Sequence, residues 1–189
     1  RNKRNISGFS KILSPLAKNV FIPISAGGGI QSIDHAMNLF NNGADKVVLN
    51  SALFNDKPLA LEIINKYGSQ SVIASVDYRG DEVFINNNNQ KLEIKLPEYI
   101  NKIQSYGVGE IYLNSIEKDG TGFGYDKETI KMISKTIEIP LIIAGGAGNA
   151  KHLLECIFID KVDAVATANL FNFIGDGLPK ARKMIIDQN

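Results

Sequence analysis

The chain has 189 residues, of which 44% are hydrophobic and 22% charged, as is typical of one soluble globular domain. Its 21 Lys and Arg residues balance 20 Asp and Glu residues, so the net charge of +1 indicates neither a nucleic-acid surface nor a polybasic membrane signal. No apolar run approaches the roughly 20 residues that cross a bilayer. His35 and His152 are too far apart in sequence to suggest a metal site. We expect a cytoplasmic protein without metal or cofactor.

Short β-branched runs alternate with amphipathic segments along the chain. Strands are predicted near residues 20–25, 45–50, 70–76, 109–114, 139–144 and 162–167. Helices are predicted near residues 9–18, 31–42, 57–67, 97–106, 126–136, 149–158 and 178–187. A hairpin is predicted between Val83 and Ile94, around four consecutive asparagines. This alternation predicts a parallel α/β sheet, and the mostly apolar strands indicate that both of its faces are covered.

The sequence repeats over a long distance. Residues 21–29 and 138–146 each run from a proline through a β-branched stretch into glycines. Aligning Pro23 with Pro140 also aligns His35 with His152. The offset of about 117 residues is far longer than a solenoid repeat, so it indicates two half-domains.

The strand count of the two halves predicts the fold. Four predicted strands fall in the second half and only two in the first, so symmetry places two more strands before Arg1. Eight such strands close a barrel. We therefore predict an α/β (β/α)8 barrel with a twofold half-barrel repeat, whose first two strands are missing from this chain. Residues 1–189 would form a single, N-terminally incomplete domain. An open doubly wound sheet is the alternative, but it would not explain the repeat.

Glycine runs follow two of the predicted strands, at residues 27–29 and 145–146. In such barrels the site lies at the C-terminal strand ends, where exposed N–H groups and a following helix can hold an anion. The two runs are repeat mates, which favours a substrate with a phosphate at each end. The alternative is that these glycines only form tight turns.

Charged residues stand at both ends of the predicted strands. Asp77 follows an apolar strand and is a candidate general acid or base, although a helix cap or an ion pair with Arg79 would also explain it. Asp45, Lys46 and Glu110 begin strands and therefore belong to the opposite end of the barrel. Charges there commonly cap the barrel or form surface pairs.

Seven short motifs carry a family resemblance. They are AGGGI at 26–30, GADKV at 43–47, LNSA at 49–52, GVGEI at 107–111, DGT at 119–121, GYD at 124–126 and AGGAGN at 144–149. In this order and spacing they resemble the cyclase subunit of imidazole glycerol phosphate synthase over nearly the whole chain. The GGAGN run and the GYD motif favour this cyclase over the related isomerase of histidine synthesis.

The resemblance implies a function and its residues. Family members take ammonia from a partner glutaminase subunit, in a heterodimer, and join it to a phosphorylated small-molecule substrate that is then cyclised and cleaved. Asp77 matches one of two acid–base aspartates, and the other belongs to a strand before Arg1. The phosphate contacts map onto Gly29, Asn50 and Ser51 at one end, and onto Asp119, Gly120, Thr121, Gly145, Gly146, Ala168 and Asn169 at the other. Lys46 and Glu110 match the ammonia gate, and Asp45 matches a partner-facing acid.

Several positions depart from the family pattern. Glu117-Lys118 replaces Asp-Arg, Asn169 and Val48 replace serines, and Ala144 replaces a small hydroxyl residue. These changes resemble a side branch of the family that uses glutaminase-derived ammonia to amidinate a surface-glycan sugar. Three hypotheses therefore stand: the histidine-pathway cyclase, this glycan paralogue, and a non-catalytic phosphate-binding barrel.

Overall fold

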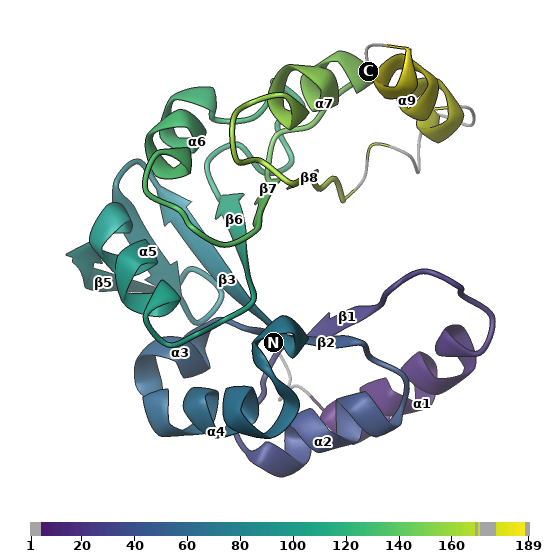
Figure 1. Cartoon of the computed structure of the whole chain (residues 1–189), viewed down its shortest axis with the longest axis vertical. Helices are drawn as coiled ribbons and strands as arrows, with labels where there is room; N and C mark the ends of the chain where they lie inside the picture. Colours follow the sequence, from purple (N-terminus) through teal and green to yellow (C-terminus); the bar gives the residue numbers. More distant parts are fainter. Residues whose placement is uncertain (1–4, 169, 171–176, 188–189) are drawn as a thin grey trace. The chain divides into compact units, whose positions relative to one another are not determined.

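The computed structural model describes residues 5–168, 170 and 177–187, and these form two compact units (Figure 1). The first unit comprises the described residues of 1–75 and 103–110. The second comprises those of 76–102 and 111–189.

Three parallel strands run through the first unit. They are β1 (Ser25–Gly27), β2 (Lys46–Leu49) and the first half of β3 (Val72–Arg79), with Ser25 opposite Lys46 and Val47 opposite Val72. The helices of this unit are α1 (Ile6–Ala17), α2 (Ile33–Asn41), the short α3 (Ser51–Asn55) and α4 (Lys57–Tyr67), followed by the 3-10 turn η1 (Ser69–Ser71). Helix α2 packs against α1, α4 and β2, so the helices cover one face of these strands.

The second unit continues the same alternation. Its strands are the second half of β3, β4 (Glu82–Ile85), β5 (Gln90–Lys95), β6 (Glu110–Ser115), β7 (Leu141–Ala144) and β8 (Ala164–Val165). Its helices are α5 (Leu96–Gln104), α6 (Lys127–Ser134), α7 (Ala150–Ile157) and α9 (Gly177–Ile186), and both α5 and β6 extend partly into the first unit. Strands β6, β7 and β8 are parallel neighbours, and β4 and β5 form an antiparallel hairpin on β3.

The strand order confirms the predicted fold class. The described strands follow the order β1-β2-β3-β6-β7-β8, with six parallel members joined by helices. The Gly109 N–H donates to the Val72 carbonyl, and the Ile116 N–H donates to the Tyr78 carbonyl, both over 3.0 Å. Residue numbers rise together in these two bonds, so β3 and β6 are parallel. Neighbours in sequence are thus neighbours in the sheet, as in a (β/α)8 barrel, whereas a doubly wound sheet reverses its order at a switch point.

Burial alternates along the strands and separates two faces. In β6, Ile111 and Leu113 are buried, whereas Tyr112 and Asn114 are half-buried. Successive side chains point to opposite faces of a strand, so the buried residues face the helices and the half-buried ones face the inside of the sheet. The polar residues of interest lie on this inner face or at its ends.

The twofold repeat is visible in matched hydrogen bonds. The Asp45 carboxylate accepts a bond from the Ile24 N–H (2.7 Å), and the Asp163 carboxylate accepts one from the Leu141 N–H (2.9 Å). Each aspartate directly precedes a strand and ties it to the beginning of the previous one. The same residue type therefore performs the same structural task in both halves of the repeat.

Three details differ from the sequence prediction. Strand β1 begins at Ser25 instead of residue 20, and the short helix α3 was not predicted. Strand β3 continues to Arg79 because its last residues pair with β4, so Asp77 lies inside a strand, opposite Phe84. The predicted hairpin is confirmed, and Asn86, Asn87 and Asn88 form its turn at positive φ. No helix in the part of the chain that the structure describes could span a membrane.

Candidate functional site

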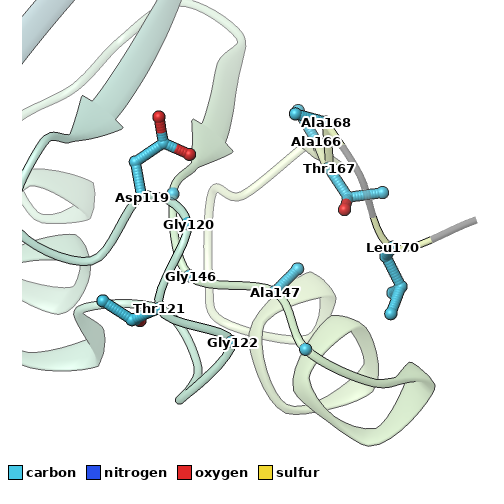
Figure 2. Close-up of a pocket in the computed structure, with 12 residues that line it drawn as sticks. Asp119, Gly120, Thr121, Gly122, Gly146, Ala147, Ala166, Thr167, Ala168 and Leu170 are labelled. Atoms are coloured by element: carbon cyan, nitrogen blue, oxygen red, sulfur yellow. The ribbon is translucent and has the colours of Figure 1, made fainter. Parts of the chain in front are cut away.

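A cavity of about 330 Å³ opens in the second unit, beyond the C-terminal ends of β7 and β8. Its lining residues are Asp119, Gly120, Thr121, Gly122, Gly145, Gly146, Ala147, Gly148, Ala166, Thr167, Ala168 and Leu170. Figure 2 shows the segments around Gly120 and Gly146 on one side of the cavity, and Ala166, Thr167, Ala168 and Leu170 on the other. The cavity therefore brings together three stretches that are far apart in sequence.

The loop that follows β6 is built from two successive turns. The Asp119 N–H donates to the Ser115 carbonyl (2.9 Å), and the Thr121 N–H donates to the Lys118 carbonyl (3.1 Å). The Thr121 hydroxyl donates to the same Lys118 carbonyl (2.7 Å). Thr121 thus holds the turn with both of its donors. Gly120, at φ +76°, takes the left-handed conformation that the turn requires.

The loop that follows β7 packs directly on this first loop. A Cβ on Gly146 would lie 2.1 Å from the Gly124 carbonyl oxygen, and one on Gly148 would lie 2.0 Å from that of Gly122. The Gly124 N–H also donates to the Gly146 carbonyl (2.7 Å). Close backbone contact therefore explains Gly146 and Gly148 even without an anion. The glycines fit the tight-packing alternative as well as they fit phosphate binding.

Unused backbone donors are the feature that favours an anion here. The N–H groups of Gly120, Gly122, Gly146 and Ala147 donate no hydrogen bond to any acceptor among the residues that the structure describes. Successive free N–H groups in a turn at positive φ form a concave anion-binding surface, and the start of α7 adds a favourable dipole. The cavity can thus hold a phosphate through its backbone.

Asp77 lies next to Asn114 on the neighbouring strand. The Asn114 amide donates to the Asp77 carboxylate over 2.9 Å. Tyr112, two residues before Asn114, faces the same way, and its pKa is raised by burial and by the nearby charges of Asp119 and Asp77. Figure 2 shows the Asp119 carboxylate turned toward the strand ends. The inner face of this unit therefore gathers two carboxylates, an amide and a phenol.

Asn114 and Tyr112 received no role in the sequence interpretation. The signal was present, because Glu110, Tyr112 and Asn114 alternate with apolar residues and so share one face of a strand. The predicted barrel implied that β6 lies beside β3, but the sequence could not show the register that places Asn114 against Asp77.

The other proposed phosphate residues lie in the first unit. Gly29 has φ +81°, the Asn50 amide donates to the Ser75 carbonyl (3.0 Å), and the Ser51 hydroxyl donates to the Asn50 side-chain oxygen (3.3 Å). A cavity of about 370 Å³ in this unit is lined by Asn5, Ile6, Phe9, Gly27, Gly28 and Leu39 and includes none of the three. A phosphate contact from Gly29, Asn50 and Ser51 stays a prediction.

The predicted gate residues form an ion pair within the first unit. The side chains of Lys46 and Glu110 form an ion pair, and they are 25% and 19% exposed to solvent. Asp45 uses its carboxylate to hold the Ile24 N–H, so its established contact is structural. Of the second phosphate set, Ala168 lines the cavity described above, and Asn169 lies outside the described residues.

A family comparison now places the chain. Residues 3–175 match the sequence pattern of a protein family described as "Histidine biosynthesis protein". The chain belongs to this family. It is 40% identical to a putative imidazole glycerol phosphate synthase subunit hisF2 of Parasynechococcus marenigrum, over 97% of this chain and 70% of that protein.

Two further relatives agree with this assignment. The imidazole glycerol phosphate synthase subunit HisF of Chlorobium phaeovibrioides is 39% identical, over 89% of this chain and 69% of the relative. That of Chlorobaculum tepidum is 38% identical, over 88% and 68%. The chain is therefore a HisF-like member of the histidine biosynthesis family, as the motifs predicted.

Proposed function

We propose that this chain is the ammonia-using cyclase and lyase subunit of imidazole glycerol phosphate synthase. It would convert a ribulosyl aminoimidazole carboxamide nucleotide and ammonia into imidazole glycerol phosphate and an aminoimidazole carboxamide ribotide. The observation that carries the proposal is the cavity around Gly120 and Gly146, with its free N–H groups. In barrels of this kind the strand ends that border it carry the active site.

Asp77 is the proposed acid–base residue of the second unit. Its place on the inner face of β3, two residues before the end of the strand, matches that role, because a half-buried carboxylate there can reach a bound substrate. The Asn114 amide donates to one carboxylate oxygen, which fixes the direction of the group. A charged, oriented carboxylate can accept a proton from the ammonia-derived nitrogen during ring closure.

The cavity is the proposed site of one substrate phosphate. Gly120, Gly146 and Ala147 would donate N–H groups to the phosphate oxygens, whereas Asp119, an anion itself, would hold the loop in place. Gly29, Asn50 and Ser51 are the proposed contacts to the phosphate at the other end of the substrate. This pairing follows from the repeat, since Gly29 and Gly146 are mates.

The proposed partner is a glutaminase subunit: the names of the relatives call HisF a subunit, and the family resemblance implies that a glutaminase is the other one. It would supply ammonia at the end of the strands where Lys46 and Glu110 pair. Ammonium is no nucleophile, so a sheltered route through the fold would keep the nitrogen in its reactive, uncharged form. We place this enzyme in the cytoplasm, where its substrates would be made.

Complementation tests the proposal directly. The intact gene should restore growth without histidine to a strain that lacks the cyclase, and Asp77→Asn should abolish the rescue. Failure of the intact gene, with the protein present in soluble form, would contradict the histidine-pathway assignment.

The glycan-amidinating paralogue remains the second candidate because of particular substitutions. Val48 lies on the inner face of β2, and Ala144 ends β7 beside the cavity, where family members carry hydroxyl groups. Losing both hydroxyls changes the hydrogen bonds open to a substrate without removing Asp77 or the phosphate loops. If complementation fails while phosphate binds near Gly146, this candidate is favoured. If phosphate binds but neither reaction shows ammonia-dependent turnover, the non-catalytic phosphate-binding barrel is favoured.

A further inference from the structure

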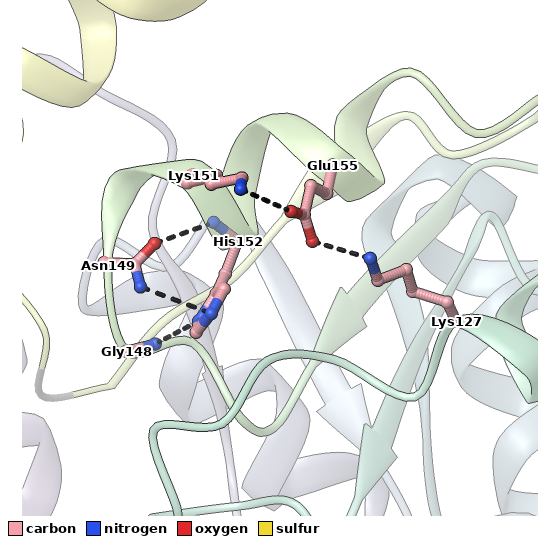
Figure 3. A network of polar contacts seen from close by, with 6 residues as sticks. All are labelled: Lys127, Gly148, Asn149, Lys151, His152 and Glu155. Carbon is pink, nitrogen blue, oxygen red and sulfur yellow. Dashed lines mark hydrogen bonds and ion pairs between the residues drawn. The ribbon is translucent and has the colours of Figure 1, made fainter.

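A histidine stands beside the phosphate cavity and contacts both of its glycine loops. His152 lies in the first turn of α7, whose N-cap is Asn149. Its Nδ1 accepts a hydrogen bond from the Gly148 N–H over 3.0 Å. Its ring also lies over Gly124, since a Cβ built on that glycine would be 3.6 to 3.7 Å from three ring atoms. Figure 3 shows His152 directed back from α7 toward Gly148.

The hydrogen bond from Gly148 determines the tautomer of the ring. A backbone N–H can only donate, so Nδ1 must be unprotonated, and a neutral ring then carries its proton on Nε2. The Asn149 amide nitrogen lies 3.2 Å from Nε2 in a contact whose donor and acceptor depend on the tautomer, whereas the backbone N–H of Gly148 can only donate. The Gly148 contact therefore decides the assignment.

Helix α7 is itself fixed to the segment that follows the first loop. The Glu155 carboxylate forms an ion pair with the Nζ of Lys127 at the start of α6 (2.6 Å) and a longer one with the Nζ of Lys151 (3.8 Å), as Figure 3 shows. Helix α6 begins directly after the GYD motif, and Asp126 is its N-cap. His152 thus projects from a helix that is held in place relative to both loops.

The same arrangement occurs in the other half of the repeat. His35 is the mate of His152, and its Nδ1 accepts a hydrogen bond from the Gln31 N–H over 3.3 Å. Ser32 caps this helix as Asn149 caps α7, through the N–H of the histidine in each case. Each histidine thus accepts a hydrogen bond from the N–H four residues before it, in the loop that contains or follows the glycines. A chance contact would not be expected at both positions.

We propose that His152 is a positioning residue for the phosphate site, which holds the glycine loop so that its free N–H groups face the cavity. By engaging the Gly148 N–H, the ring fixes the end of the loop and leaves Gly146 and Ala147 to donate to a ligand. By packing on Gly124 it keeps the two loops in contact. The ligand class is a phosphate monoester dianion. This inference rests on the phosphate site proposed above.

Two substitutions separate the hydrogen bond from the packing. His152→Phe keeps a ring against Gly124 but removes the acceptor. His152→Asn restores an acceptor, because the Asn Oδ1 is as many bonds from Cβ as the histidine Nδ1. In the intact protein we expect His152→Phe to raise the Kd for inorganic phosphate about tenfold, which corresponds to about 1.4 kcal/mol. His152→Asn should stay within about threefold of the wild type.

His35→Phe is the matched control, since it removes the mate's acceptor in the other unit. It should leave phosphate binding near Gly146 unchanged, as monitored by the amide NMR signals of Gly146 and Ala147. In the proposed reaction, His152→Phe should raise KM for the phosphorylated substrate more than it lowers kcat. Equal phosphate binding by wild type and His152→Phe would overturn the inference, and so would equal losses from the Phe and Asn variants.

Two further observations keep the test decisive. If His152→Phe does not fold, the 15N shifts of the wild-type ring decide, because a proton on Nδ1 would refute the Gly148 bond and a proton on Nε2 would support it. If the wild-type protein binds no phosphate near Gly146, the proposed function fails, and this inference fails with it. If the wild type binds phosphate and the variants do not differ, only the positioning role fails.

Discussion

Replacing Gly146 by alanine tests how the two loops of the cavity are held together. The new Cβ would lie 2.1 Å from the Gly124 carbonyl oxygen, and the residue would keep φ +108°. A left-handed backbone costs a non-glycine residue about 1–2 kcal/mol, and forcing an atom into packed structure costs about 1–3 kcal/mol more. We therefore expect Gly146→Ala to lower the free energy of unfolding by about 2 to 5 kcal/mol.

Gly120→Ala is the matched control for this prediction. Gly120 also has a positive φ, at +76°, but no atom lies within 4 Å of the position where its Cβ would stand. Only the backbone cost applies, and the stiffer unfolded chain offsets part of it, so we expect a loss of about 1 kcal/mol. Urea denaturation followed by circular dichroism measures both values. Equal destabilisation by the two substitutions would show that the loops do not touch as described.

Three other predictions concern separate residues. Asp77→Asn should lower ammonia-dependent turnover by at least about 10²-fold, and a change of less than threefold would remove Asp77 from the mechanism. Lys46→Glu should reduce glutamine-dependent activity more than activity with ammonium salt at high pH. Adding Glu110→Lys in the same chain should restore part of the glutamine-dependent activity, because the ion pair is then re-formed with reversed charges. Equal losses in both assays would make Lys46 structural. Burial raises the pKa of the Cys156 thiol to about 11, so about one thiol in a thousand is ionised at pH 8 and Ellman's reagent should react only after unfolding. The folded chain thus holds the Cys156 proton more tightly than the unfolded chain does. The free energy of unfolding should therefore fall as the pH rises from about 9 toward 11, because the unfolded chain loses this proton first.

Asp77 shows how far sequence reasoning reached at the site. Its position after an apolar run suggested a strand end and acid–base chemistry, although β3 continues two residues beyond it, to Arg79. Its partner was not predicted, because Asn114 lies 37 positions further along the chain and meets it only in the particular register of β3 and β6, which the barrel prediction did not specify. His152 was aligned with His35 by the repeat, yet only the folded structure reveals that each ring accepts a hydrogen bond from an N–H of its own loop.

The sequence by itself determined the elements, their alternation, the repeat and the family. These properties are local or periodic: β-branched runs, amphipathic spacing and proline–glycine punctuation act within a few residues, and the repeat is a comparison of the chain with itself. Pairing with β4 lengthened β3 beyond its apolar run, which no local pattern indicated.

Only the tertiary structure decided which loops touch and which backbone donors stay free. Gly145 and Gly146 were predicted from sequence to approach a phosphate, but a glycine is equally required where another backbone lies against it. In this chain Gly146 and Gly148 lie against Gly124 and Gly122, while the N–H groups of Gly146 and Ala147 remain free to bind a ligand. Close packing and unused donors are relations between distant segments, so they exist only once the chain has folded.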